Sequence, residues 1–177
     1  MLNRIKFFNI NNVNFKKLLF FKSNDKIYIF YKGDNGSTIP MLLELPPLEV
    51  YSIRGSEITL SLEDKSRSTD FFLELDNTII DIIKTNKEKW NITELHKYKK
   101  IIEENSYGDR VLRLKNMRSK NINTYWFDNN KKRIDKIYDY ENKIDKIKTL
   151  IEISNINISK RNIIKLEIRL HQVLICN

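Results

Sequence analysis

Two long segments near the end of the sequence alternate apolar and polar residues. From Ile164 to Leu170 every second residue is isoleucine or leucine, and the residues between them are charged. The segment Lys146–Ile158 is also rich in isoleucine, and residues 159–161 form a short polar connection. A period of two gathers the apolar set on one face of a β-strand, whereas a helix would scatter it around its axis. We therefore predict a long antiparallel hairpin formed by residues 146–158 and 162–175.

Shorter segments with β character precede this hairpin. Leu48–Arg54 and residues 57–63 are joined by Gly55 and Ser56, which supply a tight turn. With the long hairpin, the predicted strands lie at residues 4–8, 14–22, 26–32, 38–45, 48–54, 57–63, 112–115, 121–127, 146–158 and 162–175. Many hairpin-linked strands favour an antiparallel sheet or a partly closed barrel.

A helical period appears only in the middle of the chain. From about residue 72 to residue 90 the apolar positions follow helical spacing, with acids early and lysines late, as the helix dipole favours. Residues 64–69 are polar and are predicted to be a loop. Thr93 can cap a second, shorter helix that ends near residue 104. Residues 134–145 are ambiguous and fit a short helix.

These patterns define the fold class. We predict a mainly β protein with a helical insertion of one or two helices at about residues 72–104. The chain of 177 residues shows no internal repeat and no linker, so a single domain over residues 1–177 is the economical interpretation.

Composition restricts the chemistry. The four glycines form no phosphate-binding loop, and only His96, His171 and Cys176 are available as soft zinc ligands. We therefore predict no cofactor and no metal. One cysteine cannot form an internal disulfide, and no apolar run is long enough to span a bilayer. The expected location is intracellular, in the cytoplasm or nucleus, without a membrane partner.

Several carboxylates cluster before and within the predicted helix. They are Glu63, Asp64, Asp70, Glu74 and Asp76. Two such groups can hold Mg²⁺ in a nuclease, but acids around a helix start more often cap it or face solvent. We predict that the protein is not an enzyme, and keep a metal-dependent nuclease as a minor alternative.

Positive charge is concentrated late in the chain. The net charge is +9, and residues 110–136 contain nine lysines or arginines against two aspartates. The cations proposed to contact phosphates are Arg110, Arg113, Lys115, Arg118, Lys120, Lys131, Lys132 and Arg133. Cations that follow a phosphate backbone, together with flat rings on which bases stack, are typical of surfaces that bind single-stranded nucleic acid. The plainer interpretation is a solvated basic edge beside a core strand.

Aromatic residues lie between and before these basic blocks. On an alternating strand, Trp126 faces one side while Tyr125 and Phe127 face the other, so at least one ring is exposed. The segment Lys26–Lys32 has apolar or aromatic residues on both faces, which makes Tyr28 and Tyr31 further candidates. We predict that exposed members of this set stack on bases.

Four sequence segments carry a resemblance to a known family. They are Ile-Pro-Met-Leu-Leu-Glu-Leu-Pro at 39–46, Thr-Leu-Ser-Leu at 59–62, Phe-Leu-Glu-Leu-Asp at 72–76, and Arg-Leu-His-Gln-Val-Leu-Ile at 169–175. Their order over about residues 38–175 resembles the single-stranded DNA-binding proteins of large eukaryotic DNA viruses. The resemblance implies an OB-like barrel and a non-enzymatic role in replication or recombination. Frequent Ile, Asn and Lys and the absence of Ala, typical of AT-rich coding, agree with a viral source.

Two functions of different classes follow. The first is sequence-independent binding of single-stranded DNA, or of RNA, through a basic groove and aromatic stacking. The second is a viral structural or adaptor protein whose basic surface meets acidic protein or RNA. In that case exposed strand edges would support a homo-oligomer.

Overall fold

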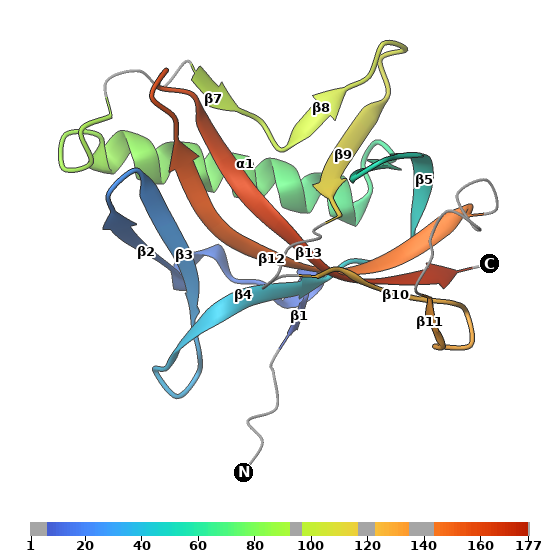
Figure 1. The fold of residues 1–177 in the computed structure, drawn as a ribbon. Coiled ribbons are helices and arrows are strands. Elements are labelled where there is room, and N and C mark those ends of the chain that lie inside the picture. Colours follow the sequence, from blue (N-terminus) through green and yellow to red (C-terminus); the bar gives the residue numbers. More distant parts are fainter. Residues whose placement is uncertain (1–6, 93–96, 117–122, 135–143, 177) are drawn as a thin grey trace.

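The strand β12 (Lys146–Ile158) lies at the centre of the fold. The computed structural model describes residues 7–92, 97–116, 123–134 and 144–176. In it β12 pairs antiparallel with β13 (Ile164–Cys176) from Lys146↔Cys176 to Ile158↔Ile164, which confirms the predicted long hairpin (Figure 1). Along its other edge β12 pairs in turn with three further strands.

The remaining strands are shorter than β12 and β13. The strands are β1 (Phe8–Asn9), β2 (Leu18–Ser23), β3 (Lys26–Lys32), β4 (Thr38–Glu44), β5 (Leu48–Arg54), β6 (Glu57–Ser61), β7 (Tyr98–Lys99), β8 (Ile102–Glu104), β9 (Arg110–Lys115), β10 (Tyr125–Phe127) and β11 (Arg133–Ile134). One α-helix, α1 (Arg67–Asn86), and two 3₁₀ turns, Ile10–Asn12 and Phe15–Lys17, complete the described residues. The predicted strands 26–32 and 48–54 coincide with β3 and β5.

Five of these strands close into a barrel in the order β5–β6–β9–β13–β12. The pairings are antiparallel except between β9 and β13, which run parallel and, within the described ranges, join through the single pair Arg169↔Lys115. Register shifts at Leu150/Ile151 and Ile153/Asn155 interrupt the β12–β13 ladder. Such bulges bend a strand, which lets β12 border the barrel at one end and the β3–β4 sheet at the other. The predicted mainly β, OB-like barrel is confirmed.

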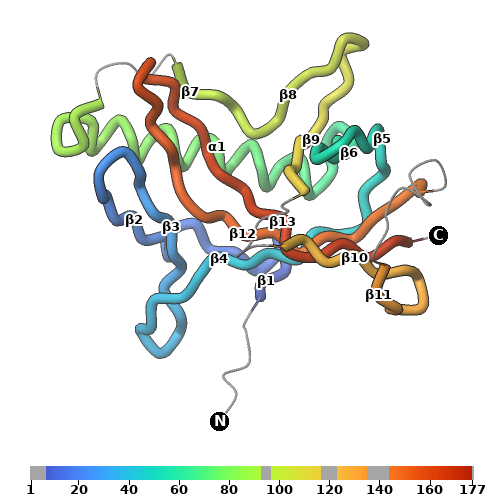
Figure 2. The backbone as a smooth tube through the Cα atoms, in the orientation of Figure 1, coloured from blue at the N-terminus to red at the C-terminus, as the bar shows by residue number. Residues whose placement is uncertain are grey.

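Helix α1 covers one side of the core. Its buried stripe is Phe71, Phe72, Leu75, Ile79 and Ile83, and Figure 2 shows the helix passing behind β12 and β13. The helix begins five residues before the predicted start. Ser66 is the N-cap and accepts a hydrogen bond from the Thr69 amide at 3.3 Å. The predicted loop at 64–69 was therefore wrong in its second half, because polar residues there form the cap and first turn.

The predicted second helix is wrong where the structure describes it. Residues 98–99 and 102–104 are strands, and Ile102 pairs with Leu112 of β9. Tertiary pairing outweighs the weak helical spacing of this segment. Residues 93–96 lie outside the described ranges, as does most of the ambiguous segment 134–145 and of the predicted strand 4–8. The strand predicted at 121–127 is described as β10 from Tyr125 onward.

A buried carboxylate ties this segment to the helix. Asp76 on α1 accepts a hydrogen bond from the Tyr98 hydroxyl at 2.6 Å and one from the Ile101 amide at 3.0 Å. Burial raises the pKa of Asp76 above its usual range, and the two hydrogen bonds offset only part of that effect. Burial beside this carboxylate also raises the pKa of Tyr98, so the phenol stays protonated as a donor. Asp76 thereby fixes the position of β7 and of the turn that follows it.

Replacing Asp76 with alanine should destabilise the fold by about 2–4 kcal/mol, because the Tyr98 hydroxyl and Ile101 amide would lose their buried acceptor. Urea unfolding measures this loss. Asp81→Ala is the matched control, since Asp81 is an exposed carboxylate on the same helix, 3.6 Å from Lys84. It should change the free energy of unfolding by less than about 0.5 kcal/mol. Equal losses in both variants would contradict the anchoring role.

Candidate nucleic-acid interface

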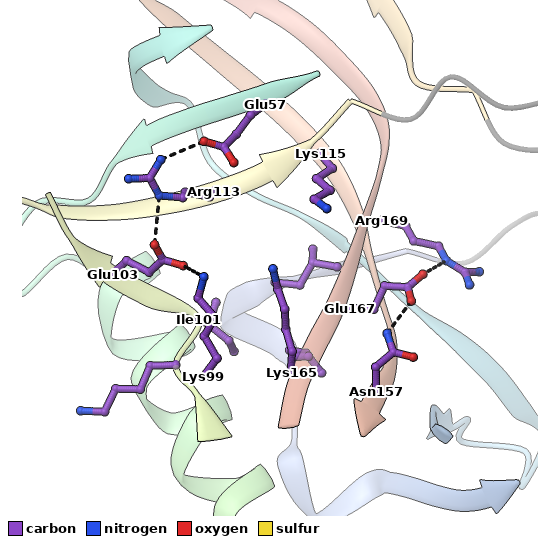
Figure 3. A pocket seen from close by; sticks show the side chains of 13 residues that line it. Glu57, Lys99, Ile101, Glu103, Arg113, Lys115, Asn157, Lys165, Glu167 and Arg169 are labelled. Carbon is purple, nitrogen blue, oxygen red and sulfur yellow. Dashed lines mark hydrogen bonds and ion pairs between the residues drawn. The ribbon is translucent and has the colours of Figure 1, made fainter. Parts of the chain in front are cut away.

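A groove of about 440 Å³ lies between β13 and the strands β7, β8 and β9 (Figure 3). Its charged and polar lining is Glu57, Lys99, Lys100, Glu103, Arg113, Lys115, Asn157, Lys165, Glu167 and Arg169, with Ile101, Leu166 and Ile168 as its apolar part. Six cations and three carboxylates therefore surround one cavity. This excess of positive charge suits an anionic ligand.

Strand register brings these side chains together. Lys165, Glu167 and Arg169 occupy alternate positions of β13, and the two residues between them lie toward the core. Directly paired residues of neighbouring strands point to the same face. Lys165 pairs with Lys99 of β7, and Arg169 pairs with Lys115 of β9. The alternation predicted for this strand is thus what forms the groove wall.

Arg113 is held by two carboxylates. Its Nη1 lies 2.8 Å from Glu57 Oε1 and its Nε lies 3.0 Å from Glu103 Oε2, as Figure 3 shows. Glu103 also meets Lys99, whose Nζ lies 2.9 Å away. Burial acts to raise the pKa of Glu103, but Lys99 and Arg113 together hold it below its usual value. The ion pairs fix the β6, β8 and β9 side of the groove, and Arg113 and Lys99 are largely neutralised there.

On the opposite wall of the groove, the carboxylate of Glu167 also has hydrogen-bond partners. Its Oε2 accepts hydrogen bonds from the side-chain amides of Asn157 at 2.8 Å and Asn155 at 3.2 Å. Its Oε1 accepts a hydrogen bond from Arg169 Nε at 2.9 Å. Burial opposes ionisation, but these donors hold the pKa of Glu167 below its usual value. All three groove carboxylates therefore already have partners.

Lys115 and Lys165 remain available for a ligand. Within the part of the chain that the structure describes, neither has a carboxylate at ion-pair distance, and Figure 3 shows both between the two occupied clusters. Burial, followed by the charges of Lys99 and Lys115, lowers the pKa of Lys165. A phosphate bound here would relieve that repulsion, so the arrangement of charge favours an anionic ligand.

The structure divides the basic stretch predicted from the sequence. Arg113 and Lys115 line the groove, whereas Arg110 pairs with Asp64 at 3.1 Å. Arg118 and Lys120 lie outside the described residues. Lys131, Lys132 and Arg133 are exposed around the turn between β10 and β11. β10 lies beside the far half of β13, where Tyr125 pairs with Gln172. The stretch therefore contributes to two separate places on the surface.

The predicted stacking residues separate by burial. Trp126 is 5% exposed and Tyr31 is 4% exposed, so neither can offer a ring face to a base, and these two assignments are corrected. Trp126 belongs to the core, and the Tyr31 hydroxyl accepts a hydrogen bond from the Asn14 amide at 3.1 Å. Tyr28 is exposed and Phe127 is half-buried. Tyr125 is 42% exposed, with the Arg133 guanidinium 5.0 Å from its ring centre.

Sequence reasoning missed four groove cations, namely Lys99, Lys100, Lys165 and Arg169. The first two were assigned to a helix that does not form. The last two lie on the polar face of a strand whose alternation was recognised, and that face was the available signal. Pairing across β13 could not be read from the sequence, because β7 and β9 join it in parallel from distant segments.

Other chemistry finds little support in the described residues. No group of three or more His, Cys, Asp or Glu side chains there is placed to hold a metal ion. Two of the carboxylates considered for a nuclease site already have partners. Asp76 is buried and accepts hydrogen bonds from Tyr98 and Ile101, and Asp64 forms an ion pair with Arg110. No helix among the described residues is long and apolar enough to cross a membrane.

Comparison with known proteins places the fold. Neither the models of known protein families nor the curated proteins contain a match to this sequence. The single-stranded DNA-binding protein of bacteriophage Enc34, in complex with single-stranded DNA, aligns with a TM-score of 0.50 and 11% identity, over 92% of this chain and 96% of that chain. Another structure of the Enc34 protein aligns with a TM-score of 0.50 and 12% identity, over 90% and 89% of the two chains.

A crystal structure of gp2.5, a single-stranded DNA-binding protein encoded by bacteriophage T7, aligns with a TM-score of 0.47 and 12% identity, over 77% of this chain and 86% of that chain. At their low identity, the Enc34 alignments show a shared fold. The neighbours found are bacteriophage proteins, whereas the sequence segments resembled a family from eukaryotic viruses. The fold expected from that resemblance is supported, and the eukaryotic-virus family stays a prediction.

Replacing Lys165 with methionine should raise the thermal midpoint at pH 7 by about 1–2 °C, because the variant removes a partly buried charge repelled by Lys99 and Lys115. The ammonium group of Lys165 loses its proton at a lower pH in the folded protein than in the unfolded chain, where its pKa has the ordinary value of 10.5. At pH values between these two pKa values, the unfolded chain therefore binds the Lys165 proton more tightly than the folded protein does. The contribution of Lys165 to stability therefore rises with pH through that window, and the variant should lack this rise. Thermal melts from pH 7 to 10.5 measure both effects, with Lys84→Met as control. A lower midpoint than wild type would contradict the electrostatic account.

Proposed function

We propose that this protein binds single-stranded DNA without sequence preference and without catalysing a reaction. The observation that carries the proposal is the basic groove on the outside of the barrel, in which Lys115 and Lys165 have no carboxylate partner among the described residues. The fold shared with the Enc34 single-stranded DNA-binding protein supports the choice of ligand.

The groove suggests how a strand would be held. Phosphates would contact Lys115 and Lys165, with Lys100 at the rim. Contacts to phosphate position a strand but do not read its bases, so binding would be largely independent of sequence. Arg113 would act mainly by holding Glu57 and Glu103 away from the ligand. Binding of these lysines would release counterions from the DNA phosphates, so the affinity for DNA would fall as the salt concentration rises.

Exposed rings beyond the groove would add stacking. Tyr125, backed by Arg133, lies on the strand that neighbours the far half of β13. Stacking on such a ring is worth about 1–3 kcal/mol per base and favours unpaired over duplex DNA. We further infer a role in viral DNA replication or recombination, on the grounds of the sequence resemblance and the AT-rich composition.

Fluorescence anisotropy with labelled single-stranded and duplex oligonucleotides of equal length, titrated across salt, tests the proposal. We expect wild-type protein to prefer the single strand at every salt concentration. Lys115→Gln and Lys165→Gln should each weaken binding by about three- to tenfold at low salt and reduce the slope of log K against log salt by about 0.7. Lys84→Gln on α1 makes the same charge change away from the groove and should bind as wild type.

Other outcomes would change the interpretation. If the protein bound single strands and duplexes equally well and lost all binding at high salt, the groove would only attract nucleic acid through its positive charge and would not select single strands. No binding at low salt, combined with a stable multimer in sedimentation, would favour the structural or adaptor protein.

A further inference from the structure

The outer face of the sheet continues from the groove to the hairpin formed by β2 and β3. Residues that pair directly across strands point to the same face, so the printed registers define rows across the sheet. One row runs Ser23, Lys26, Asn157, Lys165 and Lys99, across β2, β3, β12, β13 and β7. The next row runs Phe21, Tyr28, Asn155 and Glu167. Both rows start on the hairpin and end in the groove.

The hairpin end of these rows is aromatic. Phe21 is 51% exposed and Tyr28, directly opposite, is 37% exposed. Phe30 is half-buried, and its ring meets Phe21 edge-on with centroids 5.7 Å apart. These three rings, which we call the aromatic platform, lie outside the cluster of core residues. The residues that β3 contributes to the core lie on its opposite face and are Ile27, Ile29 and Tyr31.

The platform is joined to the groove by direct contacts. Tyr28 pairs with Asn155, whose side-chain amide donates to the groove residue Glu167 at 3.2 Å. Lys26 pairs with Asn157, which itself lines the groove. Figure 1 shows β2 and β3 on one side of β12 and β13, with β9 on the other. At about 4.8 Å per strand, the row from Ser23 to Lys99 spans about 19 Å.

Charge around the platform favours an anionic occupant. Residues 16–32 contain five lysines and one acid, Asp25. Among them Lys22, Lys26 and Lys32 are exposed. A partner that covered the rings by apolar contact alone would give these ammonium groups no new counter-charge, and of the three lysines only Lys26 already interacts with a carboxylate in the described part of the chain, that of Glu167. A nucleic-acid strand supplies phosphates for the lysines and flat bases for the rings.

We infer that the aromatic platform is a second subsite for the single strand bound in the groove, with bases stacked on Tyr28 and Phe21 and a phosphate on Lys26. The strand would cross β13, β12, β3 and β2 nearly at right angles to their direction. This inference rests on the proposed function and adds the path of the ligand beyond the barrel. A short strand would fill the groove alone, whereas a longer one would reach both subsites.

Anisotropy with oligothymidines of about 6 and about 16 nucleotides tests this path, since one OB barrel covers about 4–16 nucleotides. Relative to wild type, the double variant Phe21→Ser/Tyr28→Ser should bind the longer strand about tenfold more weakly and the shorter strand within about twofold. Lys115→Gln should lose affinity for both lengths. Tyr51→Ser removes an equally exposed ring from β5 and should leave both affinities unchanged.

Two further variants keep the test independent of folding. Tyr28→Leu keeps apolar area but removes the ring face, and Lys26→Gln changes only an exposed charge. Both should selectively weaken binding of the longer strand while thermal melts stay as in wild type. Tyr28→Phe should bind as wild type, because it keeps the ring.

Three results would overturn the inference. The first is wild-type affinity of the platform variants for the longer strand, with Lys115→Gln still defective. The second is an equal loss for both lengths without a change in melting. The third is a dimer, detected by sedimentation, that Phe21→Ser dissociates, since a second copy would then occupy the platform. Failure of wild-type protein to bind any single strand would instead refute the proposed function itself.

Discussion

The structure depends on the backbone hydrogen bonding of β12. Every buried N–H and C=O group of a strand needs a partner, and β12 is buried along most of its length. One edge is satisfied by β13, and the other by β5, β4 and β3 in succession. An extra residue in β12, Ser154, and one in β13, His171, bend the hairpin so that three strands, all antiparallel to β12, can follow one another along its edge. The geometry of the barrel, of the β3–β4 sheet and of the groove therefore depends on this strand.

Electrostatic arrangement then distinguishes the groove from an ordinary basic surface. Glu57 and Glu103 are occupied by Arg113, and Glu167 is occupied by Arg169 and two asparagines. A surface in which carboxylates paired with every lysine would have little attraction for phosphate. Here the acids position arginine and asparagine side chains and leave the ammonium groups of Lys115 and Lys165 for a ligand.

Much of this fold was predictable from local pattern. The strands 26–32, 48–54 and 146–158 were predicted at their observed bounds, because each is rich in β-branched, aromatic or other apolar residues and is bounded by polar or turn residues, such as Gly55 and Ser56 after residue 54. Residues 98–104 were not predicted as strands because their apolar spacing is helical. β7 pairs with Ile164, far along the chain, and β8 pairs with the nearby β9 across the turn at residues 105–109. Burial of Trp126 and Tyr31 likewise depends on which face of each strand meets the core. The groove cations were visible singly, but only the parallel pairings to β13 bring them together.

The closure of the barrel has a consequence for motion. Among the residues that the structure describes, β9 and β13 are joined by the single pair Arg169↔Lys115, whereas β12 and β5 are joined by two pairs and β6 and β9 by five. Both residues of that pair line the groove. Of the seams between barrel strands, this one has the fewest backbone pairings in the described parts of the chain, so the least costly opening of the barrel lies along the groove itself. The width of the cleft is thus its most adjustable dimension, while the rest of the barrel stays closed.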